Sequence, residues 1–313
     1  MLVLLSLLTF FLWTLCFSLS KIALQYTSPI FLTAFRMALS GILLISYLCL
    51  TKHPERKLQK QTYLPLMAFG FFSIYLTNIL EFSGLQHVSA AKTCCLYSLT
   101  PFFTILLSYI HFGETITFRK CLGIFFAGAS LIPVLLTQSG SEDLFRFSSF
   151  LSWPELAVIG AVFFSTYGWI ILRILVKNQT LSPLVINGYG MGFGSVLALT
   201  HFYYISPTYP MIQGSWADFL LPVFLITLIS NLICYNLYSY LLKHLTATFL
   251  SFVGLLSPIF TSISSYFLLG EGISVEIICS SISMLFALFL VYSSEIQQGY
   301  IKSTKTPSID SGS

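Results

Sequence analysis

The chain has 313 residues, of which 56% are apolar and 8% are charged, and its formal net charge is +4. Soluble domains usually carry about 25% charged residues, so this composition excludes an ordinary water-soluble protein. With a mean hydropathy of +0.86, the chain needs membrane lipid around most of its surface, and nothing in it favours nucleic acid as a partner.

Ten apolar stretches have the length that a bilayer requires, which is roughly 20 residues per helix. The first half, 1–137, is predicted to contain the helices Leu2–Leu24, Ile30–Leu50, Leu64–Leu85, Val88–Phe112 and Phe118–Thr137. After a connecting loop at 138–152, the second half, 153–292, is predicted to contain Trp153–Val176, Leu184–Tyr204, Phe219–Leu242, Leu245–Leu269 and Ile273–Tyr292. The first stretch lacks a basic leader and a cleavage site, so we expect it to be retained. Residues 293–313 are expected to form a disordered cytoplasmic tail.

Basic residues are distributed unequally between the two sides of these helices. One side has eleven, which are Lys52, Arg56, Lys57, Lys60, Arg119, Lys120, Arg173, Lys177, Lys243, Lys302 and Lys305. The other side has three, which are Lys21, Lys92 and Arg146. Because basic loops stay in the cytoplasm, both termini are predicted to be cytoplasmic. Five helices per half is an odd number, so the halves cross the membrane in opposite directions.

A sequence pattern recurs 157 residues further along the chain. Leu99-Thr100-Pro101 with Gly113-Glu114 matches Leu256-Ser257-Pro258 with Gly270-Glu271. The repeat predicts an all-α polytopic membrane protein whose ten transmembrane helices form two inverted five-helix repeats, as in secondary transporters.

Each repeat has a proline inside an apolar segment and a glutamate after that segment. Pro101 and Pro258 each remove a helical hydrogen bond, so we expect kinks. Such kinks either serve packing alone or line a shared cavity and help the halves to move. Glu114 and Glu271 precede the fifth and tenth predicted helices, where a carboxylate stabilises the positive N-terminal end of a helix.

Motifs typical of enzymes and metal sites are absent from the sequence. It contains no G-x-x-x-x-G-K-S/T phosphate loop and no H-E-x-x-H motif, and its seven cysteines include no C-x-x-C pair. We therefore expect no catalytic residues, no metal and no cofactor.

Four charged side chains lie within or at the edge of predicted spans: Lys21, Arg36, Glu81 and Lys92. An ionised group there is costly unless it is paired or faces water. The structural alternatives are an ion pair for Arg36 and interfacial anchoring for the lysines. The position 157 residues after Glu81 is Tyr238, so the repeat itself requires no carboxylate. Aromatic and amide side chains within the spans, Trp13 among them, could supply the rest of a site. The binding candidates of this kind are Asn78, Tyr97, Trp169, Asn236 and Tyr238.

The opening residues and the paired blocks resemble one family of transporters. Trp13-Thr14, Lys21, Ser28-Pro29 and Phe35-Arg36 are similar to the pattern over the first two helices of EamA-type members of the drug/metabolite transporter superfamily. The paired L-S/T-P and G-E blocks resemble its fourth and ninth helices, and the resemblance covers the chain to about position 292. Within the superfamily, residues 78–82 and 91–95 are similar to bacterial S-adenosylmethionine/S-adenosylhomocysteine exchangers.

This resemblance implies a secondary transporter of the bacterial inner membrane that takes up S-adenosylmethionine in exchange for S-adenosylhomocysteine by alternating access. Glu81 would then bind the sulfonium or the amine, Arg36 the carboxylate, and Tyr or Trp rings the purine. The same side chains would suit an aromatic amino acid or a nucleoside. A channel and a membrane-embedded enzyme are alternatives of other classes, and the oligomeric state is not predicted.

Overall fold

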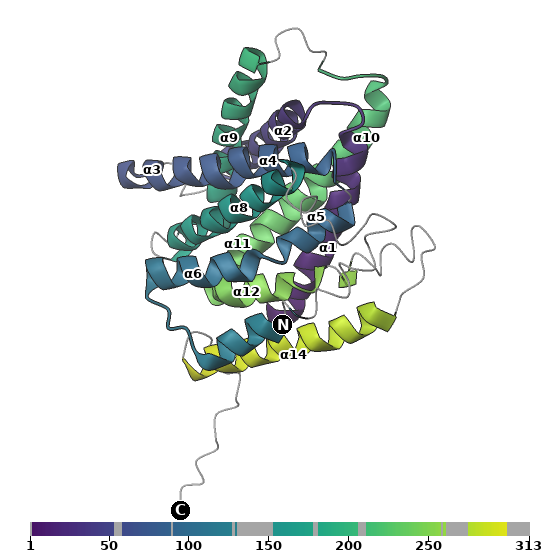
Figure 1. Cartoon of the computed structure of the whole chain (residues 1–313). Coiled ribbons are helices and arrows are strands. Elements are labelled where there is room, and N and C mark those ends of the chain that lie inside the picture. The colour runs from purple at the N-terminus through teal and green to yellow at the C-terminus, as the bar shows by residue number, and fades with distance from the viewer. Residues whose placement is uncertain are drawn as a thin grey trace, which may run out of the picture.

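The computed structural model describes residues 2–52, 58–88, 90–126, 129, 153–177, 181–205, 211–257, 259–260 and 275–298. The secondary structure of these residues is helical, and the helices pack in one bundle (Figure 1). The first half contains α1 (Leu2–Ala23), α2 (Pro29–Leu50), α3 (Lys60–Phe69), η2 (Gly70–Leu76), α4 (Thr77–Leu85), α5 (Ala90–Tyr97), α6 (Thr100–Phe112) and helical residues 118–126. The second half contains α8 (Trp153–Lys177), α9 (Pro183–Ile205), α10 (Trp216–Ile226), η4 (Thr227–Cys234), α11 (Tyr235–His244), α12 (Ala247–Gly254) and α14 (Val275–Gln297).

Within the described ranges, five helical units are long and apolar enough to cross a bilayer. They are Leu2–Ala23, Pro29–Leu50, Lys60–Leu85, Trp153–Lys177 and Trp216–His244. Large apolar side chains such as Leu50, Leu64 and Leu221 are exposed on the outside of the bundle. Lipid can surround such side chains without the cost that water imposes. The chain is therefore an integral membrane protein, as its composition predicts. The predicted fifth and ninth spans continue into residues outside the described ranges.

Two wide, π-helical segments interrupt membrane helices at matching places. η2 joins α3 to α4, η4 joins α10 to α11, and they begin at positions 70 and 227, which are 157 residues apart. At the end of η2, Thr77 Oγ1 donates to the Phe72 carbonyl, five residues earlier, at 2.7 Å. π-Helical turns are rare and concentrate at functional sites. Both segments lead into helical turns that line a central cavity.

The predicted fourth span is divided into two helices. α5 ends at Tyr97 and α6 begins at Thr100, which places Pro101 in the first turn of α6, where its missing N–H costs little. The Tyr97 carbonyl, which loses its helical donor at Pro101, accepts a hydrogen bond from Thr100 Oγ1 at 2.5 Å. In the second half, α12 has the same length as α5 and begins 157 residues later, at Ala247 instead of Ala90. The repeat-related Pro258 lies outside the described residues.

The two halves are packed closely against each other where glycines face a neighbouring helix. A Cβ atom on Gly41 of α2 would lie 2.8 Å from the backbone nitrogen of Gly192 of α9, so only glycine permits this approach. A Cβ atom on Gly168 of α8 would lie 2.4 Å from the Cβ of Ser73 in η2. These contacts fix α2 and η2, which position the charged residues of the cavity, against the second half.

The last helix runs to Gln297, five residues beyond the predicted end at Tyr292. α14 lies along one end of the bundle beside α12 (Figure 1). Its final turn is bound to the chain that follows α6. Thr117 and Ser294 share a hydrogen bond of 2.7 Å, and Arg119 donates to Gln297 Oε1 at 2.7 Å. These hydrogen bonds extend the helix into the first residues of the expected tail, and residues 299–313 lie outside the described ranges.

Candidate functional site

A cavity lies between the two halves, with about 840 Å³ of empty space including its mouth. Aromatic and small hydroxyl side chains make up most of its wall. The first half contributes Phe10, Trp13, Thr14, Cys16, Phe17, Ser20, Arg36, Thr77, Asn78, Glu81, Cys94, Tyr97 and Thr100. The second half contributes Ser165, Trp169, Ser230, Tyr235, Ser251, Gly254 and Ser257. Both halves therefore form one site.

Arg36 brings a positive charge into the cavity from α2. It is 4% exposed, and its Nη2 donates to Asn78 Oδ1 of α4. The guanidinium carbon lies 4.9 Å from the centre of the Phe82 ring, and Asn78 Nδ2 donates to the Ile74 carbonyl at 2.7 Å. The Nε of Arg36 has no partner among the described residues. Since a guanidinium has five donor hydrogens, this one keeps donors for an anionic group of a ligand.

Glu81 brings a negative charge into the same cavity from α4, one helical turn beyond Asn78. Its Oε2 accepts a 2.5 Å hydrogen bond from the Tyr97 hydroxyl of α5. Within the described part of the chain, no cation lies within ion-pairing distance of this carboxylate. The cavity therefore holds two opposite charges that are not paired with each other. This arrangement suits a ligand that carries both a carboxylate and a cation.

Aromatic rings from both halves form another part of the wall. Trp13 of α1 and Trp169 of α8 stack with ring centroids 6.1 Å apart and planes inclined by 28°. Trp13 Nε1 donates to Ser230 Oγ of η4 at 3.0 Å, which fixes the indole. Tyr235 lies edge-on to Trp13, with centroids 5.5 Å apart. Such rings offer flat faces on which a planar ligand group or a cation can bind.

Several lining positions occur in pairs that are 157 residues apart. The pairs are Asn78 and Tyr235, Cys94 and Ser251, Tyr97 and Gly254, and Thr100 and Ser257. Glu81 has no carboxylate counterpart, because the related position is Tyr238, which packs against Trp169 with centroids 4.8 Å apart. The two halves thus contribute equivalent surfaces, while both charges among the described lining residues come from the first half.

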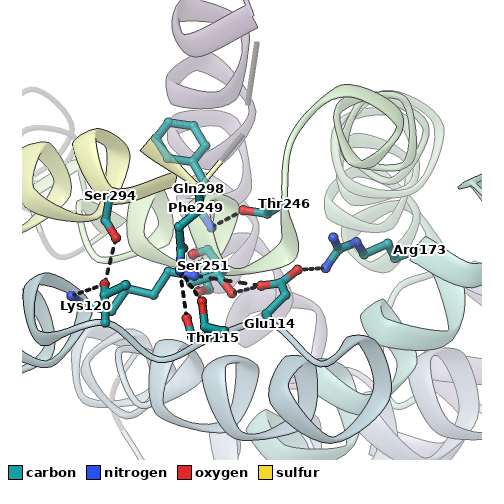
Figure 2. A network of polar contacts seen from close by, with 11 residues as sticks. Glu114, Thr115, Lys120, Arg173, Thr246, Phe249, Ser251, Ser294 and Gln298 are labelled. Carbon is teal, nitrogen blue, oxygen red and sulfur yellow. Dashed lines mark hydrogen bonds and ion pairs between the residues drawn. The ribbon is translucent and has the colours of Figure 1, made fainter. Parts of the chain in front are cut away.

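A second polar cluster surrounds Glu114 (Figure 2). Gly113 ends α6 in the left-handed conformation, with φ of 62°, and directs the chain inward so that Glu114 is 4% exposed. The carboxylate pairs with Arg173 of α8, accepts from Thr248 Oγ1 of α12 at 3.2 Å and lies 4.0 Å from Lys120 Nζ. The next helical residues begin at position 118. Glu114 therefore joins elements of both halves in addition to preceding a helix.

The structure brings five of the predicted binding residues together in the cavity: Arg36, Asn78, Glu81, Tyr97 and Trp169. Asn236 and Tyr238 are not in its lining. Asn236 Oδ1 accepts from Asn187 Nδ2 at 3.0 Å, between α11 and α9. Pro101 is adjacent to the lining residue Thr100. The Lys92 side chain, Pro258 and Glu271 lie outside the described residues.

Apart from Trp13, the contribution of α1 was not predicted from the sequence. Trp13, Cys16, Phe17 and Ser20 line the cavity with the spacing i, i+3, i+4, i+7 of one helix face. Two small polar residues at that spacing within an apolar helix are the signal that would have identified it. The serines Ser165, Ser230 and Ser251 carry a weaker signal, because serine in a membrane helix is also common at packing interfaces.

A membrane-embedded helical bundle with a charged, aromatic-lined cavity between its halves is the arrangement of a transporter for small molecules. The sequence profile of the EamA-like transporter family matches residues 1–136 and again residues 152–293. The chain belongs to the EamA-like transporter family. It is therefore a transporter of a small metabolite and not an enzyme.

Two chlamydial proteins are similar to the chain over nearly its whole length. The S-adenosylmethionine/S-adenosylhomocysteine transporter of Chlamydia muridarum is 36% identical, with 94% of this chain and 92% of the relative covered. The protein of the same description from Chlamydia trachomatis serovar L2 is also 36% identical, with 93% and 89% covered. A solved crystal structure of a protein with 13% identity superposes with a TM-score of 0.73, covering 95% of this chain and 97% of that one, which shows a shared fold.

Proposed function

We propose that the chain exchanges S-adenosylmethionine for S-adenosylhomocysteine across a bacterial inner membrane. The observation that carries this proposal is the pair of opposite, mutually unpaired charges, Arg36 and Glu81, in one aromatic-lined cavity. The chlamydial relatives support it, because they are described as transporters of these two compounds and are 36% identical to this chain.

The chemistry of the two ligands matches the lining. Arg36 binds the α-carboxylate through its remaining donors, and Glu81 faces the sulfonium of S-adenosylmethionine. The stacked faces of Trp13 and Trp169 receive the purine, and the hydroxyl groups of the lining bind the ribose. Because S-adenosylhomocysteine lacks only the methyl group and the sulfur charge, it occupies the same positions.

We further propose that the protein consists of ten transmembrane helices in two inverted repeats with both termini in the cytoplasm. The equal offsets of η2 and η4 and of α5 and α12 support the repeat, and the excess of basic residues on one side supports the orientation. Transport then proceeds by rocking of the two halves, with the breaks near Pro101 and Pro258 as flexible points.

The test is uptake of radiolabelled S-adenosylmethionine into proteoliposomes that contain the purified chain and no nucleotide. We expect saturable uptake that requires S-adenosylhomocysteine or S-adenosylmethionine inside the vesicles and that external S-adenosylhomocysteine inhibits. Vesicles with the Asp218→Asn variant, which changes an exposed carboxylate outside the cavity, serve as the matched control and should behave as the native chain does. If an external aromatic amino acid or nucleoside inhibits uptake and external S-adenosylhomocysteine does not, the chain transports a metabolite other than the proposed pair. Uptake that does not saturate would indicate a channel.

A further inference from the structure

We infer that Glu81 is a proton-binding site of the transport cycle, and that S-adenosylhomocysteine leaves together with one proton while S-adenosylmethionine enters without one. This inference rests on the proposed exchange. It follows from comparing the charges of the cavity with the charges of the two ligands.

The two ligands differ by one charge at the sulfur atom. S-Adenosylmethionine has a sulfonium, whereas S-adenosylhomocysteine has a neutral thioether, and both have one carboxylate and one ammonium. Among the described residues that line the cavity, Arg36 and Glu81 carry formal charges of opposite sign, which cancel. If both groups stayed ionised throughout, the carrier loaded with S-adenosylmethionine would hold one more positive charge than the carrier loaded with S-adenosylhomocysteine.

Along α4, Glu81 lies about one helical turn beyond Asn78, the residue that accepts from Arg36. Arg36 donates to Asn78, which precedes Glu81 by three residues, or about 4.5 Å along the helix axis. With the carboxylate on Arg36, the ammonium on the same α-carbon stays at that end of the site. The sulfur, at the far end of a two-carbon chain, then reaches the Glu81 end.

The two loaded states therefore place different charges opposite the Glu81 carboxylate. The sulfonium of S-adenosylmethionine compensates it. The thioether of S-adenosylhomocysteine does not, and the carboxylate then keeps one neutral partner among the described residues, the Tyr97 hydroxyl at 2.5 Å. A carboxylate that faces no cation within the membrane is costly even though Arg36 balances its charge in the cavity as a whole, and binding a proton removes that local cost.

The step balances in atoms and charge. Water on the side where S-adenosylhomocysteine binds supplies the proton. Water on the other side receives the proton when S-adenosylmethionine displaces S-adenosylhomocysteine and the proton from the site. One positive charge crosses in each direction, so the exchange is electroneutral.

Within the described lining, the remaining titratable or charged groups are thiols, phenols and one guanidinium. Besides Glu81, these described lining residues are Cys16 of α1, Arg36 of α2, Cys94 and Tyr97 of α5, and Tyr235 of α11. Thiols and phenols are mostly neutral at pH 7 and arginine stays charged. α8, which packs along α4, presents Ser165 and Trp169 to the cavity, and its Glu155 is outside the lining. Lys21 of α1 donates to the Val88 carbonyl.

The experiment measures the distribution of labelled S-adenosylmethionine at equilibrium in proteoliposomes with equal S-adenosylhomocysteine on both sides. With the interior one pH unit more acidic, outward movement of protons should drive about tenfold accumulation inside, because one proton is exchanged per molecule. A tenfold potassium gradient with valinomycin should leave the distribution unchanged. An exchange that carries one net charge would instead shift it about tenfold with the potential.

Glu81→Gln identifies the group that binds the proton. At saturating ligand, this variant should lose the response to the pH gradient and acquire a response to the potential, while Asp218→Asn should respond as the native chain does. If the distribution in the native chain follows the membrane potential and does not respond to the pH gradient, the proton site is refuted and the exchange itself is not. Retention of the pH response in Glu81→Gln also overturns the assignment. Absence of any exchange refutes the proposed function itself.

Discussion

Replacing Arg36 by glutamine should weaken the binding of S-adenosylmethionine and S-adenosylhomocysteine by the same factor, whereas Glu81→Gln should weaken the former more. Arg36 is 4% exposed, and Asn78 is the one hydrogen-bond partner of its guanidinium within the described residues, so the remaining guanidinium donors are available to the carboxylate that both ligands share. A hydrogen bond to a charged group contributes about 1.5–3 kcal/mol. Losing it corresponds to a dissociation constant raised by about ten- to a hundredfold.

The assay is equilibrium binding to the purified protein, with labelled S-adenosylmethionine as the direct ligand and S-adenosylhomocysteine as the competitor, so that each variant gives two constants. Arg119→Gln is the matched control, because Arg119 is exposed, lies outside the cavity and donates to Gln297. It should change neither constant. Unequal losses in Arg36→Gln would refute the assignment of the shared carboxylate to this guanidinium. Equal losses in Glu81→Gln would remove Glu81 from the sulfonium, provided that both variants elute as native protein does.

Three further results are expected. Glu114→Gln leaves Arg173 buried without its anion, which should destabilise the protein by about 3–5 kcal/mol and lower its melting temperature. Adding Arg173→Met should restore much of the lost stability. An unchanged melting temperature in Glu114→Gln would contradict this. Trp169→Leu removes one face of the stacked indole pair and should weaken both ligands alike, by about 1–3 kcal/mol; an effect on one ligand alone would show that the purine binds elsewhere. Reporter fusions should read cytoplasmic at Lys57 and Ser303 and external at Ser141, and any reversal would refute the proposed orientation.

The class of protein and several residues of the candidate site could be predicted from the sequence, because hydropathy and charge act residue by residue. An isolated charge in an apolar stretch, such as Arg36 or Glu81, is costly unless the fold gives it a partner or a cavity, so its presence alone is informative. Likewise, Asn78 and Tyr97 are polar groups that a lipid-facing position would leave unsatisfied. The structure places these four side chains in one cavity.

Other features depend on geometry that single residues do not encode. The π-helical segments η2 and η4 contain no proline, and a wide turn of this kind shifts which later side chains face inward. Asn236 and Tyr238 lie just after η4, and neither reaches the cavity, although Tyr235 does. The role of Glu114 depends equally on tertiary contacts, since Arg173, its ion-pair partner, is 59 residues away in the chain.

The matched and unmatched parts of the repeat correspond to two different requirements of the proposed cycle. In the proposed cycle, two inverted halves that exchange conformations need equivalent flexible elements. The elements with equal offsets are the wide turns η2 and η4 and the helices α5 and α12, which end before the turns at 98–99 and 255–256. The ligand itself has no symmetry, because its amino-acid end and its purine differ in charge and shape. Its recognition therefore requires different groups at related positions. A carboxylate at position 81 and an aromatic ring at position 238 satisfy this requirement, since the first can compensate a sulfonium and the second supports Trp169 of the aromatic wall. On this reasoning, changes in ligand specificity among related chains should concentrate at lining positions where the halves differ, and the equivalent pairs should govern the rate of transport.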